Sequence, residues 1–396
     1  MAAETAVGAT TVEIAFVDLE RQKERLGERL STRLQAVLDH GRYIMGPEVG
    51  ELEERLVQRC GARHAITCSS GTDALRMILM AWGIGPGDAV FVPAYTFTST
   101  AEVVALCGAV PVFCDVEADS FTMDPDALER AIARTVDAAQ LRPAAVIPVD
   151  LFGAPADYDR IGAIAGRHGI RVLADAAQSF GAVRDGRAVG TFGDATATSF
   201  FPAKPLGCYG DGGAILTDDE ELAHTLRSIR VHGQGAHKYD AVRIGLTARL
   251  DTMQAAVLLA KLEVFDDELE ERDRIAATYT EALAPFVVTP SVPTATRSAW
   301  AQYTVRTEQR DALAEGLRHR GVPTAIYYPT PLDRQTAYRG YAEEYGSPCE
   351  TAATLAATSL SLPMHPYLRP DEQQHIIEAT VRSVSEHADV AGGAVD

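Results

Sequence analysis

Short apolar runs alternate with amphipathic helical patterns along most of the chain. Several runs are too short for helices and carry no interior charge, which predicts buried strands. They are residues 64–68, 89–92, 110–114, 144–149, 171–174, 195–200 and 214–216. Between several of them lie helical patterns such as residues 158–168, where Ile161, Ile164 and Ala165 share one face. This alternation predicts an α/β fold with a mostly parallel, seven-stranded sheet that helices cover on both faces.

The pattern also divides the chain into three parts. Residues 13–40, with a helix expected from about 19 to 38, form an N-terminal segment that packs with a small domain. Residues 41–265 form the large α/β domain. Residues 266–390 form a smaller α+β domain, entered through a long helix whose acidic run at 266–273 is expected to face solvent.

The composition is typical of a packed cytoplasmic enzyme. The chain has 396 residues, 46% of them hydrophobic and 23% charged, which is enough for two domains. Its net charge of −19 argues against a nucleic-acid partner, which needs a basic face. The six cysteines show no metal-ligand spacing. Because we find no signal-peptide pattern and no apolar run of membrane-spanning length, we expect a cytoplasmic protein without a membrane partner.

Lysine is scarce, and one of the four lysines stands in an unusual sequence. Lys23, Lys238 and Lys261 lie in polar or charged segments, where we expect them to be solvated. Lys204 instead follows the uncharged run 195–203. Apolar surroundings disfavour an ammonium ion, so the pKa of such a lysine falls and its neutral amine becomes a nucleophile. Lys204 is therefore a candidate Schiff-base lysine, with a buried stem and a solvated ammonium as the simpler structural alternative.

Two motifs upstream strengthen this candidate. Asp175 ends the predicted strand 171–174, and open α/β sheets place ligand-binding groups at the carboxyl ends of their strands. A carboxylate there can pair with a protonated pyridine nitrogen, as pyridoxal phosphate (PLP) chemistry requires. Residues 70–72, Ser-Gly-Thr, open a helix directly after another predicted strand. Such an N-terminus suits a phosphate, although the sequence alone is also a good helix cap.

One long motif resembles a known family. Residues 199–213, SFFPAKPLGCYGDGG, together with DAAQS at 175–179, resemble the DegT/DnrJ/EryC1/StrS family of PLP-dependent aminotransferases, which act on nucleotide-linked keto-sugars. The resemblance extends from residues 16–19 to residues 360–366. It implies the PLP-dependent fold type I, similar to aspartate aminotransferase. Within the family, the chain most resembles enzymes that aminate the 3-keto position of UDP-linked 2-acetamido-hexuronic acids.

The resemblance also implies roles for individual residues. Lys204 and Asp175 are the implied catalytic pair. Lys204 would bind the cofactor covalently and then move a proton between substrate and cofactor, while Asp175 would keep the ring nitrogen protonated. The other residues implied in cofactor binding are Ser70, Gly71, Thr72, Phe97, Gln178, Ser199 and Thr247. Those implied in substrate binding are Arg249, Tyr327 and Tyr328.

Two positions depart from the family pattern. The family usually has asparagine, donated by the partner subunit to the cofactor phosphate, where this chain has Thr247. The uronic-acid branch tends to have histidine where this chain has Tyr327. Arg249 is implied to reach a neighbouring subunit's substrate, so the resemblance implies a homodimer with shared active sites. The two departures leave the identity of the acceptor open.

The implied reaction is a two-step transamination. An amino-acid donor, glutamate in the family, transfers its amino group to the cofactor, which then aminates the keto group of a nucleotide-sugar. An aminotransferase for a non-nucleotide ketose or an aminocyclitol precursor is one alternative, and a non-catalytic PLP-binding regulatory protein is another. Sugar dehydration is disfavoured, because the members that catalyse it have histidine in place of Lys204.

Overall fold

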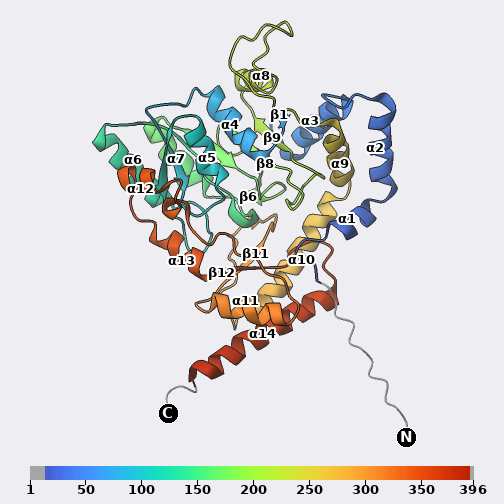
Figure 1. Cartoon of the computed structure of the whole chain (residues 1–396), viewed down its shortest axis with the longest axis vertical. Coiled ribbons are helices and arrows are strands. Elements are labelled where there is room, and N and C mark those ends of the chain that lie inside the picture. Colours follow the sequence, from blue (N-terminus) through green and yellow to red (C-terminus); the bar gives the residue numbers. More distant parts are fainter. Residues whose placement is uncertain (1–13, 393–396) are drawn as a thin grey trace.

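The computed structural model describes the chain from residue 14 to residue 392, with side chains to residue 386. A seven-stranded sheet forms the centre of the larger domain (Figure 1). Its strands, in spatial order, are β1 (His64–Cys68), β9 (Gly213–Thr217), β8 (Ala195–Ser199), β5 (Arg171–Asp175), β4 (Arg142–Val146), β2 (Asp88–Pro93) and β3 (Val110–Cys114). Neighbouring strands are parallel except for β9, which runs antiparallel to β8 and β1. The predicted mostly parallel sheet is confirmed.

The predicted and observed strand bounds differ most at β4. The apolar run predicts residues 144–149, whereas the strand spans Arg142–Val146. Pro148 has no N–H to give to the ladder, which favours an end to the strand before it. The carboxyl ends of β4 and β5 still lie side by side, because Asp175 N donates to Pro148 O (2.9 Å) and Asp150 N donates to Asp175 O (3.0 Å).

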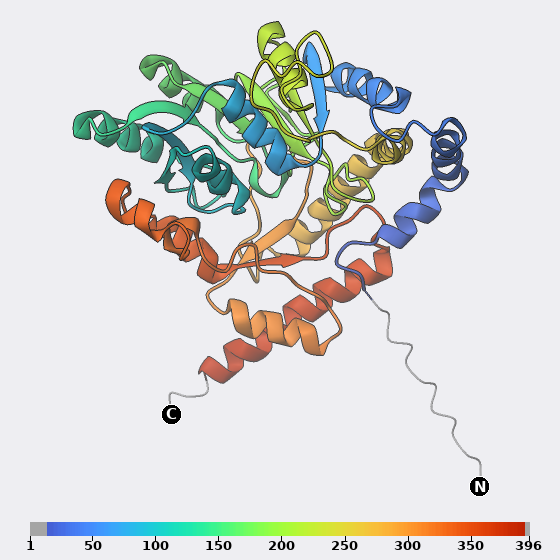
Figure 2. The ribbon, with the colours of Figure 1, turned by 45° about the horizontal axis from the view of Figure 1, so that its top comes forward.

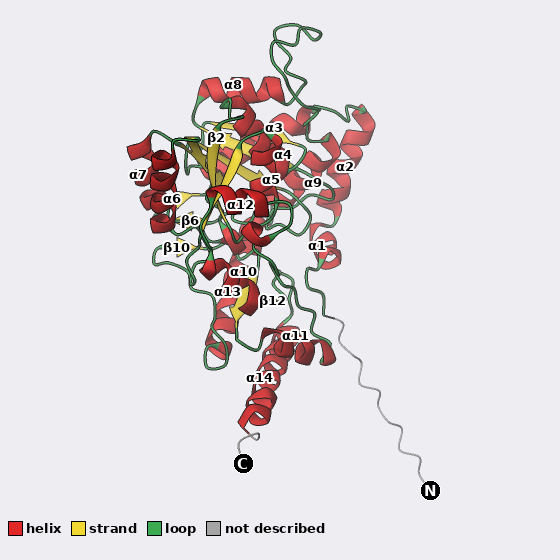
Figure 3. Cartoon of the chain, turned by 60° about the vertical axis from the view of Figure 1, so that its left-hand side comes forward, coloured by secondary structure: helices red, strands yellow, loops and turns green. Residues whose placement is uncertain are grey.

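Helices cover both faces of the sheet (Figure 3). One face packs against α3 (Pro47–Cys60), α6 (Pro125–Ala138), α7 (Tyr158–His168) and α9 (Thr252–Leu262). The other face packs against α4 (Gly71–Ala81), α5 (Ser99–Leu106) and α8 (Glu220–Ile229). Successive residues of β2 alternate between the two cores, with Phe91 on the first face and Val90 and Val92 on the second, as the two-residue repeat of a strand requires.

A smaller domain lies below the sheet (Figure 2). The long helix α10 (Phe265–Leu283) leads into it, and β11 (Tyr303–Arg306) pairs there with β12 (Ser359–Leu362). Helices α11 (Arg310–His319) and α14 (Pro370–Gly392) share its core. The remaining elements are α12 (Arg339–Tyr345), α13 (Glu350–Thr358), the short strands β6 (Val183–Arg184), β7 (Arg187–Ala188) and β10 (Thr296–Arg297), and 3-10 turns at Leu151–Gly153 and Leu332–Arg334. Ala352 and Leu355 of α13 join the core of α4 and α5 in the large domain.

The N-terminal helix predicted from 19 to 38 is two helices, α1 (Leu19–Leu26) and α2 (Glu28–His40). Gly27 separates them with a φ of 52°, a conformation that glycine adopts at little cost. Arg21 of α1 pairs with Glu372 of α14 at 2.7 Å. Leu30 of α2 belongs to the core that α9 shares. The N-terminal segment therefore contacts both domains.

The expectation that the acidic run 266–273 faces solvent holds for only part of the run. Glu268 and Arg272 are buried within the acidic run that was expected to face solvent, although Asp266, Asp267 and Glu270 are exposed. α10 runs from the core of the large domain, where Leu269 packs, into the core of the small domain, where Ile275 packs, so one side of it is buried. Arg272 instead donates to the carbonyl oxygen of Trp300 (2.8 Å).

Lys261, expected to be solvated, is fully buried. Residues 255–260 of α9 are all buried too, so no side of the helix offers this lysine a path to water. Its Nζ donates to the carbonyl oxygen of Gly207 at 2.5 Å. Between residues 14 and 392, no helix combines the length and the apolar character that crossing a bilayer requires.

Candidate active site

One cavity of about 420 Å³ brings together ten of the twelve residues predicted for the site. Its lining includes Ser70, Gly71, Thr72, Phe97, Asp175, Gln178, Ser199, Lys204, Tyr327 and Tyr328. The carboxyl ends of β1, β5 and β8 meet here, where open α/β sheets bind their ligands. Thr247 and Arg249 do not line this cavity.

The turn between β1 and α4 forms a cradle for an anion. Ser70 is the N-cap of α4, and its hydroxyl accepts from Asp73 N (3.0 Å). The N–H groups of Gly71 and Thr72 have no acceptor in the described part of the chain, and the helix dipole favours negative charge in front of them. A Cβ on Gly71 would lie 2.7 Å from Ser199 Cβ. Only glycine allows the cradle and the end of β8 to approach this closely.

A glycine of β9 closes the cradle from the other side. A Cβ on Gly213 would lie 2.5 Å from the carbonyl carbon of Ser70. Any residue other than glycine would therefore clash with the backbone of Ser70. The hydroxyl of Ser199 is therefore held beside the N-terminus of α4. These three segments, far apart in sequence, meet at one site whose backbone N–H groups are free within the described part of the chain.

Asp175 lies buried at the end of β5, where hydrogen bonds from two neighbouring residues hold its carboxyl group in place. Its Oδ1 accepts from Ala177 N (3.1 Å) and its Oδ2 accepts from the Thr100 hydroxyl (3.1 Å). Burial raises the pKa of the Asp175 carboxyl, while the two hydrogen bonds and the charge of Lys204 act in the opposite direction. A carboxylate in this position is well suited to pair with a cation inside the cavity.

Lys204 lies on the turn after β8, and its backbone N–H donates to Phe201 O (2.8 Å). Burial lowers the pKa of its amine, and the neighbouring Asp175 opposes this shift. Within the described residues, its Nζ has no hydrogen-bond partner. The side chain thus combines a lowered pKa with a free nitrogen in the cavity, which is the state that nucleophilic and proton-transfer chemistry requires.

Gln178 and the aromatic side chains form the remaining wall. The Oε1 atom of Gln178 accepts from Phe152 N (2.6 Å), which leaves its Nε2 directed to the Tyr328 hydroxyl (3.5 Å). The ring of Phe97 lies 6.0 Å from that of Tyr328 and is 51% exposed. An aromatic face that is half open in a cavity is available to stack on a ligand ring.

Thr247 and Arg249 lie on the segment that follows α8, part of which protrudes from the body of the molecule (Figures 1 and 3). Both residues belong to its base, because Ala248 between them accepts a hydrogen bond from Ser69 N (3.2 Å) and is buried. Thr247 is exposed, and its hydroxyl lies 2.7 Å from His232 Nε2. Arg249 is half-buried, without an ion pair in the described part of the chain. Their predicted contribution is to a partner subunit, and it stays a prediction.

The sequence interpretation missed Asp150, a fully buried carboxylate behind the Asp175 segment. It accepts hydrogen bonds from Ser179 Oγ (2.6 Å), Tyr158 OH (2.7 Å) and Ala156 N (2.9 Å). Burial raises its pKa to about 7. Asp150 therefore anchors Ser179, the last residue of the segment 175–179. The sequence did offer an indication of Asp150, because this residue follows a predicted strand just as Asp175 does.

The sequence interpretation also missed two further residues that line the cavity. Thr96 Oγ1 and Gln302 Oε1 are buried in the lining without a hydrogen-bond partner in the described part of the chain. Buried polar atoms are nearly always satisfied in folded proteins, so these two atoms mark the side of the cavity where a ligand with polar groups would bind. No pattern around either residue indicates this role, which arises from the fold.

The residues present fit PLP. The cradle at α4 matches its phosphate, the Asp175 carboxylate matches its ring nitrogen, and the Lys204 amine matches its aldehyde. The fold and this site define a PLP-dependent aminotransferase of fold type I. The chain belongs to the DegT/DnrJ/EryC1/StrS aminotransferase family, whose model matches residues 24–381. Solved relatives include PLP and PMP forms.

Individual relatives agree with this assignment. The chain is 47% identical over 356 residues to UDP-2-acetamido-2-deoxy-3-oxo-D-glucuronate aminotransferase of Pseudomonas aeruginosa, covering 90% of this chain and 96% of the relative. It is 40% identical to dTDP-3-amino-3,4,6-trideoxy-alpha-D-glucose transaminase of Streptomyces venezuelae, covering 97% and 99%. A crystal structure of a family member from Brucella abortus superposes with a TM-score of 0.92 at 52% identity, covering 94% and 99%.

Proposed function

We propose that the protein transfers an amino group from glutamate to the keto carbon of a nucleotide-linked sugar, and that the acceptor is a 3-keto UDP-sugar. The observation that carries the proposal is the meeting of Lys204, Asp175 and the phosphate cradle in one cavity. The similarity to the P. aeruginosa enzyme supports a UDP-linked, 3-keto acceptor.

Each part of the cavity has a role in this reaction. Bound PLP supplies an electron sink for the substrate carbon. The N–H groups of Gly71 and Thr72 and the hydroxyl of Ser199 would hold its phosphate, while Asp175 would keep the ring nitrogen protonated. Lys204 Nζ, which has no partner among the described residues, takes a proton from the donor carbon and returns one to the acceptor carbon.

The remaining cavity residues position the ring and the sugar. Gln178 Nε2 would bind the ring hydroxyl, and Phe97 would stack on the ring face. On the substrate side, Tyr327 and Tyr328 line the cavity with Thr96 and Gln302. The unsatisfied Thr96 Oγ1 and Gln302 Oε1 atoms supply hydrogen-bonding groups for the sugar.

A donor and acceptor screen tests the proposal. The holoenzyme is mixed with single amino acids, and the loss of the cofactor absorbance identifies the donor. Candidate acceptors are then added, and the return of the absorbance identifies the acceptor. A 3-keto UDP-sugar should restore it fastest. Restoration only by a non-nucleotide ketose would assign a different acceptor class, and no response to any amino acid would support a regulatory protein.

We further propose that the enzyme is a homodimer whose subunits share their active sites. The protruding segment after α8 carries Tyr239 and Ile244, which are 93% and 85% exposed, and Val242, which is 56% exposed. Apolar side chains gathered on a projection are typical of an interface. In a two-fold dimer such contacts are reciprocal, so Thr247 and Arg249 of each subunit would complete the other's cavity.

Subunit complementation tests the shared site. Lys204→Ala and Arg249→Ala, each inactive alone, are mixed and allowed to exchange. About half of the dimers are then mixed, each with one intact site, so about a quarter of the wild-type activity should return. If exchange is confirmed by native mass spectrometry and no activity returns, Arg249 serves its own subunit.

A further inference from the structure

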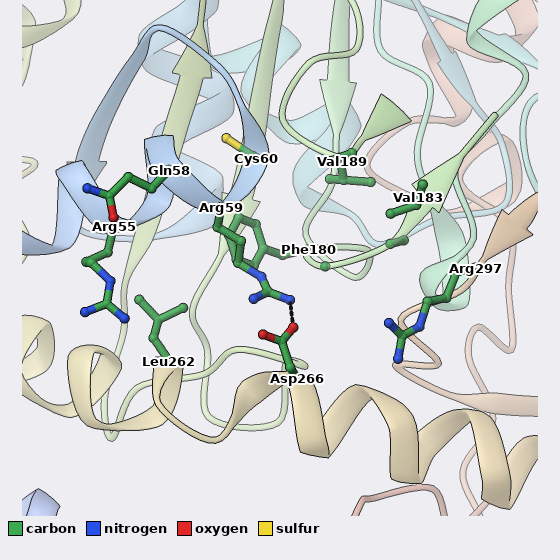
Figure 4. A pocket seen from close by; sticks show the side chains of 13 residues that line it. Arg55, Gln58, Arg59, Cys60, Phe180, Val183, Val189, Leu262, Asp266 and Arg297 are labelled. Atoms are coloured by element: carbon green, nitrogen blue, oxygen red, sulfur yellow. Dashed lines mark hydrogen bonds and ion pairs between the residues drawn. The ribbon is translucent and has the colours of Figure 1, made fainter. Parts of the chain in front are cut away.

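A second cavity, of about 430 Å³, lies apart from the lining residues of the active site. It is bounded by α3, by the segment from Phe180 to Val189 and by the junction of α9 and α10 (Figure 4). Three guanidinium groups line it, those of Arg55, Arg59 and Arg297, against a single carboxylate, that of Asp266. The proposed reaction uses none of these residues.

Two of the three arginines are held in place at the edges of the cavity. Arg59 Nη2 lies 2.6 Å from Asp266 Oδ1, and its guanidinium lies over the Phe265 ring at 4.6 Å. Asp266 is 71% exposed, and an ion pair this exposed is weak. The Phe265 ring supports the guanidinium of Arg59, and the weak pair with Asp266 occupies only one of its terminal nitrogens (Figure 4).

Arg297 is fixed from behind in the same way. Its Nε donates to Asp273 Oδ2 (2.7 Å), and Asp273 Oδ1 accepts from Trp300 Nε1 (2.9 Å). This arrangement uses one edge of the guanidinium and leaves both terminal nitrogens without a partner among the described residues. Pre-positioned donors of this kind bind an anion with little further loss of conformational entropy.

Arg55 has no hydrogen bond or ion pair in the described part of the chain, although it is half-buried. It precedes Arg59 by one turn of α3, so the two side chains are neighbours on the helix surface. A partly buried, unpaired guanidinium beside a second one is unfavourable unless an anion is bound. Because the chain carries a net charge of −19, anions are repelled from most of its surface, and a concave cluster of arginines is the kind of place that attracts them.

The arrangement also indicates the class of anion. Arg55 and Arg59 stand side by side on α3, whereas Arg297 approaches from β10 on another side of the cavity (Figure 4). A single carboxylate fits one guanidinium fork, whereas two linked phosphoryl groups present oxygens in several directions. Phe180 and Leu262 add an apolar surface for the uncharged part of a ligand.

We propose that this second cavity is a ligand site, which binds a diphosphate-bearing small molecule through Arg55, Arg59 and Arg297. A nucleoside diphosphate has the required chemistry. The site depends on the geometry of the arginines and not on the proposed transamination.

Calorimetric titration of the holoenzyme with pyrophosphate tests the site, because bound PLP then fills the phosphate cradle of the first cavity. Arg55→Gln is the first variant, since Arg55 has no partner whose loss would disturb the fold. Arg55→Gln combined with Arg297→Gln should weaken pyrophosphate binding about tenfold or more. The matched control is Arg320→Gln, at the C-cap residue of α11, which is 26% exposed and lies outside the second cavity.

Three outcomes would overturn the proposal. The first is equal pyrophosphate affinity in the wild type and the double variant. The second is a loss of affinity in Arg249→Gln that matches the loss in the double variant, which would place the anion at the substrate site. The third is equally tight binding of inorganic phosphate or of malonate, which would contradict recognition of two linked phosphoryl groups. The proposal is supported if UDP and pyrophosphate bind more weakly to the double variant but not to Arg249→Gln or Arg320→Gln.

Discussion

Burial lowers the pKa of two lysines in this chain, and their surroundings differ. Lys204 faces a cavity, has no hydrogen-bond partner in the described part of the chain and lies near the carboxylate of Asp175. Lys261 is a buried residue of α9. Its Nζ donates to the carbonyl oxygen of Gly207 and lies 5.8 Å from the centre of the Tyr209 ring. A lowered pKa alone therefore does not make a lysine catalytic. Access to a cavity and a carboxylate able to stabilise charge there distinguish Lys204.

The two regions are also connected. Gly207 lies three residues after Lys204, in the segment between β8 and β9, and the ammonium of Lys261 holds its carbonyl oxygen. Lys261 therefore fixes the backbone close to Lys204. We expect Lys204 to take part in the reaction and Lys261 to fix the backbone near it. Substitutions in each region should separate these roles.

The largest expected effect is that of Lys204→Ala. Turnover should fall by about 10³-fold or more, because the variant loses both the nucleophile and the group that moves the proton. Borohydride reduction of the wild-type holoenzyme followed by peptide mapping should place the cofactor on Lys204. A reduced adduct on Lys261 would reverse the roles assigned to the two lysines.

Asp175→Asn should reduce the rate of the half-reaction by roughly 10²–10⁴-fold. Removing the charged partner of a buried cation costs about 3–5 kcal/mol, and each 1.4 kcal/mol in the barrier is a factor of ten. Stopped-flow measurement with the donor amino acid gives the rate, and circular dichroism checks the fold. A rate near that of the wild type would show that another group protonates the ring.

Much of this architecture was predictable, and the exceptions have physical reasons. All seven strands of the main sheet were visible as mostly apolar runs, because a strand buried on both faces carries no charge in its interior. Lys204 and Asp175 were visible because each follows such a run. Lys261 was misinterpreted because the acidic residues after it obscured the apolar character of α9. Thr96 and Gln302 could not be predicted, since only the fold brings them to the cavity.

Asp150→Asn tests the support beneath Asp175. The pKa of Asp150 is raised from 3.8 to about 7, so its proton is retained in the folded state and lost in the unfolded state between these values. The stability of the wild type should therefore fall as the pH rises from about 4 to 7, by up to roughly 4 kcal/mol. Asparagine has no such proton, so the variant should lack this component.

Urea unfolding of both proteins at pH 5 and pH 8 measures the difference. The variant should lose less stability than the wild type over this interval. Tyr158→Phe removes one hydrogen bond to Asp150 and keeps the carboxyl, so it serves as the control. Parallel changes in the wild type and Asp150→Asn would mean that Asp150 is ionised throughout.

The smallest effect is expected for Lys261→Met, which should keep turnover within about tenfold of the wild type because Nζ does not face the cavity. The pKa of Lys261 is lowered from 10.5 to about 8. Between these values the unfolded chain binds a proton that the folded chain does not, so the wild type gains stability as the pH rises from 8 to 10.5, by up to roughly 3 kcal/mol. Methionine cannot titrate, so the variant should lack this gain.

The sign of the difference at neutral pH depends on two opposing terms. Methionine leaves the Gly207 carbonyl without its partner, at a cost of about 1–3 kcal/mol, but it also removes a charge from the interior. The pH dependence is therefore the sharper measurement. Urea unfolding at pH 7.5 and pH 10 should show the wild type gaining on Lys261→Met, whereas Lys238→Met, at an exposed lysine, should track the wild type. A constant difference between wild type and Lys261→Met would mean that Lys261 keeps an ordinary pKa, and that the contrast with Lys204 lies in hydrogen bonding alone.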